Sequence, residues 1–424
     1  MARGWTLVVV VSAACAACAS ATAAAEPPEE ITFEVLHVAV DALPEYEGRA
    51  RLDAVAEQLA RAPVDVLCLQ GIGAPTDRTR LKTALARVFP TSVDLPTDDA
   101  SRVDDPRDAT GVVPPPPSPP CKGVEAALPG VLSCFANVGE GCVQEDTIVI
   151  AGCLRPVDCL GDERFGADPE RRCRSCIVGH ARTGTTLTEL ASRCRDMDHP
   201  LSLNGQHGMM ILSKLPLSRP SLYVLPSEGT RRAIVGATVT TSRGNSVDVF
   251  CASLGPTHDT ALPTDPRASE PYPGPYGAPR DGWLRENELQ VEQLVTHVGV
   301  RRQGRPAVVL GNFGASSQIE RNGAVVVPAS GRLGAERLEA AFAPGIAASY
   351  APSCTICSEN VLAIEQAIPS FDNRIYLAGL EGDAVVESTR SYLGSVVDAR
   401  SRPVRFPLSM QFGFRSRIAL PARR

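Results

Sequence analysis

The chain has 424 residues, of which 44% are hydrophobic and 21% are charged, and its formal net charge at pH 7 is −6. This length can bury one large core or two ordinary ones, and the composition is typical of globular proteins rather than of disordered or fibrous ones. The acidic balance disfavours general nucleic-acid binding, which is usually supported by an excess of basic side chains on one face.

The N-terminus has the features of an export signal. Arg3 is followed by an apolar run that begins at 7–11 and then by many small residues. This pattern predicts a signal peptide over 1–25 and an exported protein, periplasmic or extracellular. A lipid anchor on Cys15 or Cys18 is the alternative. The apolar run is too short to cross a bilayer, and no other segment of the sequence is long and apolar enough to be expected to do so.

Residues 31–90 are expected to form a strand, a helix, a strand and a helix in turn. Apolar residues at helical spacing mark the first helix: Leu52, Val55, Ala56, Leu59 and Ala60. The segment 64–69 is almost continuously apolar, as in a strand that is covered on both faces.

The second half of the chain repeats this alternation. Strands are expected at 208–216, 233–239, 246–254, 307–311, 373–378 and 411–420. A helix is expected around Val291, Leu294, Val295 and Val298, which share one face. Strands that alternate with covering helices predict the α/β class, here a two-sheet sandwich formed by a single domain over 26–424.

A segment at about 113–200 interrupts this pattern. The tract 113-VPPPPSPP-120 predicts a semi-rigid spacer. Eight cysteines follow it: Cys121, Cys134, Cys142, Cys153, Cys159, Cys173, Cys176 and Cys194. In an exported chain this density predicts a disulfide-rich insertion. A zinc site that includes Cys173 and Cys176 is the alternative, although the segment offers few histidines.

Four further cysteines lie outside the insertion. Cys354 and Cys357 are expected in a loop and are additional disulfide candidates. Cys68 and Cys251 lie within apolar strand segments, so we expect them to be buried free thiols.

Six segments, taken in order, resemble the endonuclease/exonuclease/phosphatase superfamily, which has the deoxyribonuclease-I-like fold. They are 35-VLHVAV-40, 64-VDVLCLQG-71, 247-VDVFCASL-254, 305-RPAVVLGNFGA-315, 372-DNRI-375 and 408-LSMQFG-413. The resemblance implies a two-sheet α/β sandwich. It also implies an active site in which carboxylates hold Mg²⁺, an Asp activates water, and His and Asn steady a phosphate ester.

The residues at the superfamily's functional positions are different in this chain. These eight positions carry Ala39, Gly71, Ser253, Asn312, Gly314, Asn373, Met410 and Gln411. None of the eight has a charged side chain. Because one lost acid or base commonly lowers a rate by about 10²–10⁴, and a lost metal ligand also removes the activated water, the chain resembles a degenerate, non-catalytic member.

We therefore expect a binding or structural role with no cofactor. The partner would be a protein or a small ligand, held at the expected active-site cleft or at the Cys-rich insertion. The alternative is a Mg²⁺-dependent phosphodiesterase or nuclease with relocated catalytic residues, for which His207, His258, Asp259 and Asp372 are the candidates. A module that binds nucleic acid without catalysis is disfavoured by the charge balance.

Overall fold

The structure is a computed structural model. It describes residues 27–38, 48–98, 101, 119–126, 128–138, 143–148, 173, 176–177, 180, 185–196, 201–227, 230–255, 282–315, 319–321, 324–326, 332–350, 354–355, 371–380, 382–391, 395–397, 405–407, 409 and 411–420. The expected signal peptide, with Cys15 and Cys18, lies outside these residues, as do most of the proline tract, Cys142, Cys153, Cys159 and Cys357.

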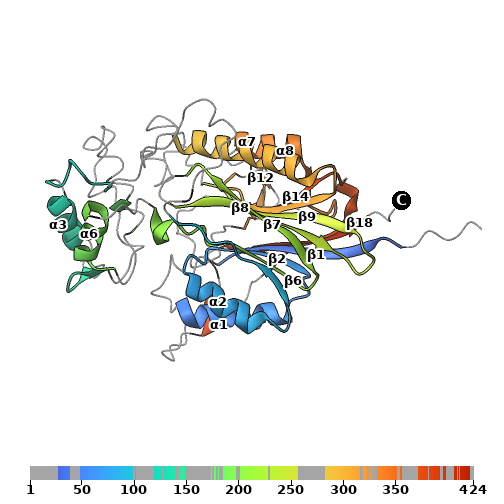
Figure 1. The fold of residues 1–424 in the computed structure, drawn as a ribbon, viewed down its shortest axis with the longest axis horizontal. Helices are drawn as coiled ribbons and strands as arrows, with labels where there is room; N and C mark the ends of the chain where they lie inside the picture. The colour runs from blue at the N-terminus through green and yellow to red at the C-terminus, as the bar shows by residue number, and fades with distance from the viewer. Residues whose placement is uncertain are drawn as a thin grey trace, which may run out of the picture.

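Two six-stranded sheets pack face to face (Figure 1). The first has the order β15-β18-β1-β2-β6-β3. Its strands are β1 (Glu29–His37), β2 (Val66–Gln70), β3 (Thr91–Val93), β6 (Met210–Ser213), β15 (Val385–Ser391) and β18 (Gly413–Leu420).

The second sheet has the order β13-β14-β10-β9-β8-β7. Its strands are β7 (Leu217–Leu225), β8 (Arg232–Thr240), β9 (Ser246–Ser253), β10 (Ala307–Asn312), β13 (Ala343–Pro344) and β14 (Asn373–Ala378). Two short hairpins lie outside both sheets, β11 (Ile319–Arg321) with β12 (Ala324–Val326) and β16 (Ser395–Val397) with β17 (Arg405–Pro407).

Helices cover the outer face of each sheet (Figure 1). On the first sheet these are α1 (Gly48–Arg61) and α2 (Pro75–Leu85), and on the second α7 (Gly282–Arg302) and α8 (Arg332–Ala341). The layers explain the sequence pattern: one apolar cluster fills the space between the sheets, and two others lie beneath the helix pairs. Strands buried on both faces, such as β10, are accordingly apolar at nearly every position. The predicted α/β two-sheet sandwich is confirmed.

The strand and helix bounds differ from the expected ones in places. β7 and β15 were not predicted as separate strands, and both are edge strands with many half-buried or exposed residues. α7 begins at Gly282, well before the apolar stripe on which its prediction rested. Its first turns bury polar side chains instead, among them Asn287 and Gln290. These side chains bind loop backbone: Asn287 Nδ2 donates to the carbonyls of Gly255 (2.7 Å) and Phe313 (2.9 Å).

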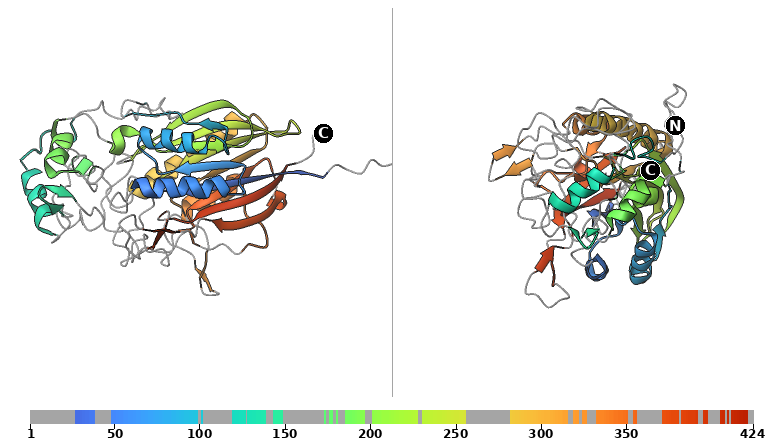
Figure 2. Two further views of the ribbon diagram at one scale, coloured as in Figure 1. Left: turned by 90° about the horizontal axis from the view of Figure 1, so that it is seen from below. Right: turned by 90° about the vertical axis from the view of Figure 1, so that its left-hand side faces the viewer.

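The Cys-rich segment forms a lobe at one end of the sandwich, where β1 ends (Figure 2). It contains α3 (Leu128–Val138), α6 (Leu187–Asp196) and the short pair β4 (Val143–Gln144) and β5 (Thr147–Ile148). Disulfides join Cys121 to Cys173 and Cys176 to Cys194 inside a small apolar cluster of its own. Cys134 and Cys354 are also disulfide-bonded. The lobe thus combines a small core with covalent links, as small disulfide-rich units do.

Candidate functional site

Four side-chain amides meet where strands of the two sheets end. Asn312, the last residue of β10, lies beside Ser253 of β9 in parallel register and beside Asn373 of β14 in antiparallel register. Its backbone N–H donates to Oε1 of Gln70, the last residue of β2 in the opposite sheet, at 3.3 Å. We call Gln70, Asn312, Asn373 and Gln411 the amide cluster.

Hydrogen bonds within the cluster use most of its polar atoms. The Nδ2 group of Asn312 donates to Gln411 Oε1 at 2.6 Å and to Asn373 Oδ1 at 3.4 Å. The Oδ1 atom of Asn312 accepts from the backbone N–H of Gly314 at 3.3 Å. Asn373 Nδ2 in turn donates to the carbonyl of Phe412 at 2.9 Å. The cluster is therefore a neutral network in which side-chain amides and neighbouring backbone groups pair with one another, which stabilises buried amides.

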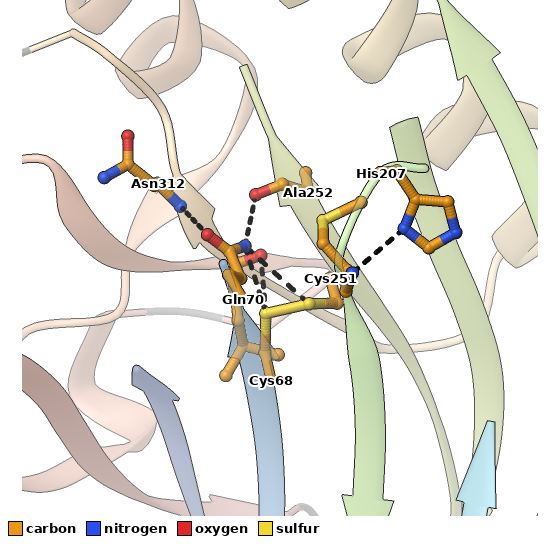
Figure 3. The surroundings of a disulfide bond; sticks show 8 residues. Cys68, Gln70, His207, Cys251, Ala252 and Asn312 are labelled. Carbon is orange, nitrogen blue, oxygen red and sulfur yellow. Dashed lines mark hydrogen bonds between the residues drawn. A yellow bond between two sulfur atoms is a disulfide. The ribbon is translucent and has the colours of Figure 1, made fainter. Parts of the chain in front are cut away.

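Gln70 connects the two sheets at this point (Figure 3). Its Nε2 group donates to the carbonyl of Ala252 on β9 at 2.7 Å, and it also lies 3.3 Å from Cys68 Sγ and 3.7 Å from Cys251 Sγ. Gln70 is fully buried, so both ends of its amide need the partners that they have.

Cys68 and Cys251 form a disulfide, so the prediction of two free thiols was wrong. The two cysteines point inward from facing strands of different sheets, with their Cα atoms 5.4 Å apart, within the range that a disulfide requires. The sequence places each cysteine in an apolar strand, but it does not show that the two strands face each other at this register. The disulfide lies directly beside the Gln70 side chain of the amide cluster (Figure 3).

Of the eight expected functional positions, Ala39 and Met410 lie outside the described residues. Four others, Ser253, Asn312, Asn373 and Gln411, come from separate elements and meet here, as the register and hydrogen bonds above show. The two glycines adjoin the cluster, and both have positive φ. Gly71 follows Gln70 with φ 77° and Gly314 follows β10 with φ 57°, a conformation that glycine adopts more readily than other residues.

The residues here fit Mg²⁺ poorly. Gly71 has no side chain. The amide oxygens of Asn373 and Gln411 already accept hydrogen bonds from Asn312, and that of Asn312 accepts one from the backbone N–H of Gly314. Within the described part of the chain, no group of three or more His, Cys, Asp or Glu side chains is placed to hold a metal ion. Mg²⁺ prefers carboxylates with near-octahedral geometry, which this network does not offer.

Of the four candidates for a relocated site, the structure describes only His207 and Asp372. His258 and Asp259 lie outside the described residues. The ring of His207 bridges two backbone groups: Nε2 lies 2.6 Å from the carbonyl oxygen of Leu95, and Nδ1 accepts from the N–H of Met209 at 3.0 Å. This arrangement requires the neutral tautomer with a proton on Nε2 and gives His207 a structural role. Asp372 uses its backbone to hold the loop after β10, since its carbonyl accepts from Phe313 N at 3.1 Å.

Burial lowers the pKa of His207 to about 4, and the charges of Arg78 and Arg231 lower it further, against the opposing effects of Leu95 and Asp94. His37 and His297 also have a pKa of about 4, again mainly through burial.

We predict that the protein loses stability as the pH falls from about 6.5 to 4. Over this range these histidines take up protons in the unfolded chain but stay neutral in the folded chain. Each of them therefore lowers the free energy of unfolding by up to about 3 kcal/mol at the acidic end.

Urea unfolding at pH 7 and pH 4.5 measures this loss. The variant His207→Gln keeps an amide donor near Leu95 and removes the titrating group, so its stability should depend less steeply on pH. An unchanged pH dependence in this variant would contradict the assignment to His207.

Sequence reasoning missed several residues that build the site. Thr355 Oγ1 accepts from the backbone N–H groups of Asp372 (3.0 Å) and Asn373 (3.1 Å), and so fixes the start of β14. Arg232 donates from Nη1 to Ser253 Oγ at 3.0 Å. The pair Arg231-Arg232 stands out in the sequence at the start of a strand, and this was the available signal.

Comparisons with known proteins give distant likenesses. The chain matches no protein-family model and no curated protein. Among solved structures it is similar to an endonuclease/exonuclease/phosphatase from Beutenbergia cavernae DSM 12333, with 12% identity, a TM-score of 0.47 and coverage of 92% of this chain and 72% of that one. It is also similar to sphingomyelinase C from Streptomyces griseocarneus, with 12% identity, a TM-score of 0.48 and coverage of 92% and 99%. At this identity the likeness concerns the fold alone.

Proposed function

We propose that this chain is an exported, non-catalytic protein of the endonuclease/exonuclease/phosphatase type, and that it acts by binding rather than by hydrolysis. One observation carries the proposal: Asn312, at the position of a catalytic Asp in the superfamily, donates both protons of its amide to Gln411 and Asn373. A neutral side-chain amide is not basic, so Asn312 cannot take a proton from water as a carboxylate can.

Two regions are candidates for the binding surface, the strand ends around the amide cluster and the Cys-rich lobe. Both lie toward the same end of the sandwich (Figures 1 and 2). Export is supported by the signal-like N-terminus and by the disulfides, which persist in oxidising compartments. In the described residues, no helix is long and apolar enough to span a membrane.

The test combines catalysis and metal binding. We expect the oxidised chain to show no Mg²⁺-dependent hydrolysis of DNA or of bis-p-nitrophenyl phosphate above a protein-free control. Calorimetry should detect no tight Mg²⁺ binding. Turnover that needs Mg²⁺ and is abolished by His258→Ala or Asp372→Ala would instead favour a phosphodiesterase with relocated catalytic residues.

Gly71→Glu tests whether restoring one expected metal ligand is enough. We expect no gain in hydrolysis, because the groups that activate water and steady the phosphate would still be missing. The variant should also lose about 1–2 kcal/mol of stability, since its backbone has φ 77°. Gly71→Ala is the matched control, because it has the same strain without the carboxylate. Mg²⁺-dependent activity in the Glu variant alone would contradict the proposal.

A further inference from the structure

Arg232 lies at the start of β8, next to the amide cluster, and its hydrogen bonding is incomplete. β8 and β9 are antiparallel, with Ala233 opposite Ser253, so Arg232 starts its strand where β9 ends. Its Nη1 group donates to Ser253 Oγ at 3.0 Å. The Nε atom is buried and has no hydrogen-bond partner, although the side chain as a whole is only half-buried.

Among the described residues, the charge of Arg232 is also only partly compensated. No carboxylate of the described residues forms an ion pair with it. Burial lowers the pKa of Arg232, and the charge of Glu286, which acts from farther away, partly opposes this effect. A guanidinium that is withdrawn from water without a carboxylate partner is costly to keep, and an unmade hydrogen bond at a buried donor calls for an explanation.

The positive charge of Arg232 lies beside the amide cluster. Ser253, which accepts from Arg232, is the register neighbour of Asn312 in the amide cluster. From the opposite sheet, His37 at the end of β1 also responds to Arg232: burial is the main cause of its lowered pKa, and the positive charge of Arg232 is the second. The neutral amide cluster therefore has a fixed positive charge beside it.

We propose that Arg232 and Ser253 form a metal-independent binding site for a singly charged oxyanion group of a ligand. A planar guanidinium carries its N–H groups in a fork that matches two oxygens of a carboxylate or of a phosphate ester, and Arg232 is only half-buried. The Ser253 hydroxyl can donate to one of the same oxygens once it accepts from Arg232. The single positive charge of Arg232 is already partly offset by the carboxylate of Glu286. It therefore balances a ligand group with one negative charge better than a group with two negative charges. This inference rests on the proposed function, because it names the ligand chemistry of a binding site without hydrolysis.

The experiment uses the full oxidised chain in the presence of a chelator, with acetate, dimethyl phosphate and sulfate as probes. The readout is the ¹⁵Nε–¹H signal of Arg232, assigned by its loss in Arg232→Lys. We expect saturable shifts with one or both of the two monoanions in the millimolar range. The ratio of acetate to dimethyl phosphate affinity then distinguishes a carboxylate ligand from a phosphate-ester ligand. A lack of any saturable shift, or sulfate binding tighter than both monoanions, would overturn the proposal.

Calorimetry on variants gives the second measurement. Arg232→Met should weaken binding of the preferred monoanion at least tenfold, and Ser253→Ala, a smaller change, should weaken it several-fold. Arg61→Met is the matched control, because Arg61 is an exposed arginine at the end of α1, and it should bind as the native protein does. Equal affinity in native protein and both site variants would refute the site. Hydrolysis of a phosphodiester after the chelator is removed would refute the proposed function but not the anion site.

Discussion

Replacing Cys68 and Cys251 together by alanine is expected to lower the free energy of unfolding of the oxidised protein by about 4–5 kcal/mol. The disulfide joins residues that are 183 positions apart, and cross-links that close long loops restrict the unfolded chain most, with about 4.7 kcal/mol for a loop of about 100 residues. The disulfides of the lobe lie inside this loop and shorten it, but the effect depends only on the logarithm of its length.

The control is the double variant Cys176→Ala with Cys194→Ala, whose bond spans 18 positions and should contribute about 3 kcal/mol. Urea unfolding gives the two free energies. Hydrogen exchange then shows where each loss falls, at the ends of β2 and β9 in the first case and in α6 in the second. A smaller loss for removal of Cys68–Cys251 than for removal of Cys176–Cys194 would contradict the expectation that the longer loop gives the larger stabilisation.

The sequence predicts the elements whose burial is recorded in a local pattern, but not the contacts that depend on how the two sheets stack. Apolar runs such as 307–311 and the helical stripe at Leu52, Val55 and Leu59 report burial directly, and both were placed correctly. Edge strands such as β7 are half-exposed and lack that signal. The pairing of Cys68 with Cys251 depends on how two sheets stack, which no local pattern records.

The same limit applies to the candidate site. The framework strings predict which positions lie at strand ends, so Ser253, Asn312, Asn373 and Gln411 could be named in advance. The sequence cannot show that Asn312 donates to its two amide neighbours, or that Arg232 reaches Ser253. These contacts depend on side-chain directions at the ends of strands from different parts of the chain. They give Ser253, Asn312, Asn373 and Gln411 a described arrangement with its own hydrogen bonds and with a positive charge beside it.

Arg78 on α2 is expected to be the other major determinant of stability near this site. Its side chain is only 1% exposed. It donates to Asp94 (2.8 Å), to the carbonyls of Ile72 (3.0 Å) and Gly73 (2.7 Å), and to Gln206 Oε1 (2.8 Å). The guanidinium therefore fixes the loop that follows β2 and ties it to the segment before β6.

Replacing Arg78 by methionine should lower the free energy of unfolding by about 3–5 kcal/mol, because it leaves a nearly buried carboxylate and two carbonyls without their main partner. Lys82, at 3.6 Å from Asp94, compensates only in part. The matched control is Arg80→Met on the same helix, whose exposed ion pair with Asp53 is worth at most about 1 kcal/mol. Urea unfolding of the two variants provides the measurement. Similar losses for both would show that the bonds of Arg78 to the loop contribute little, and that the end of β2 is held by the disulfide and Gln70 instead.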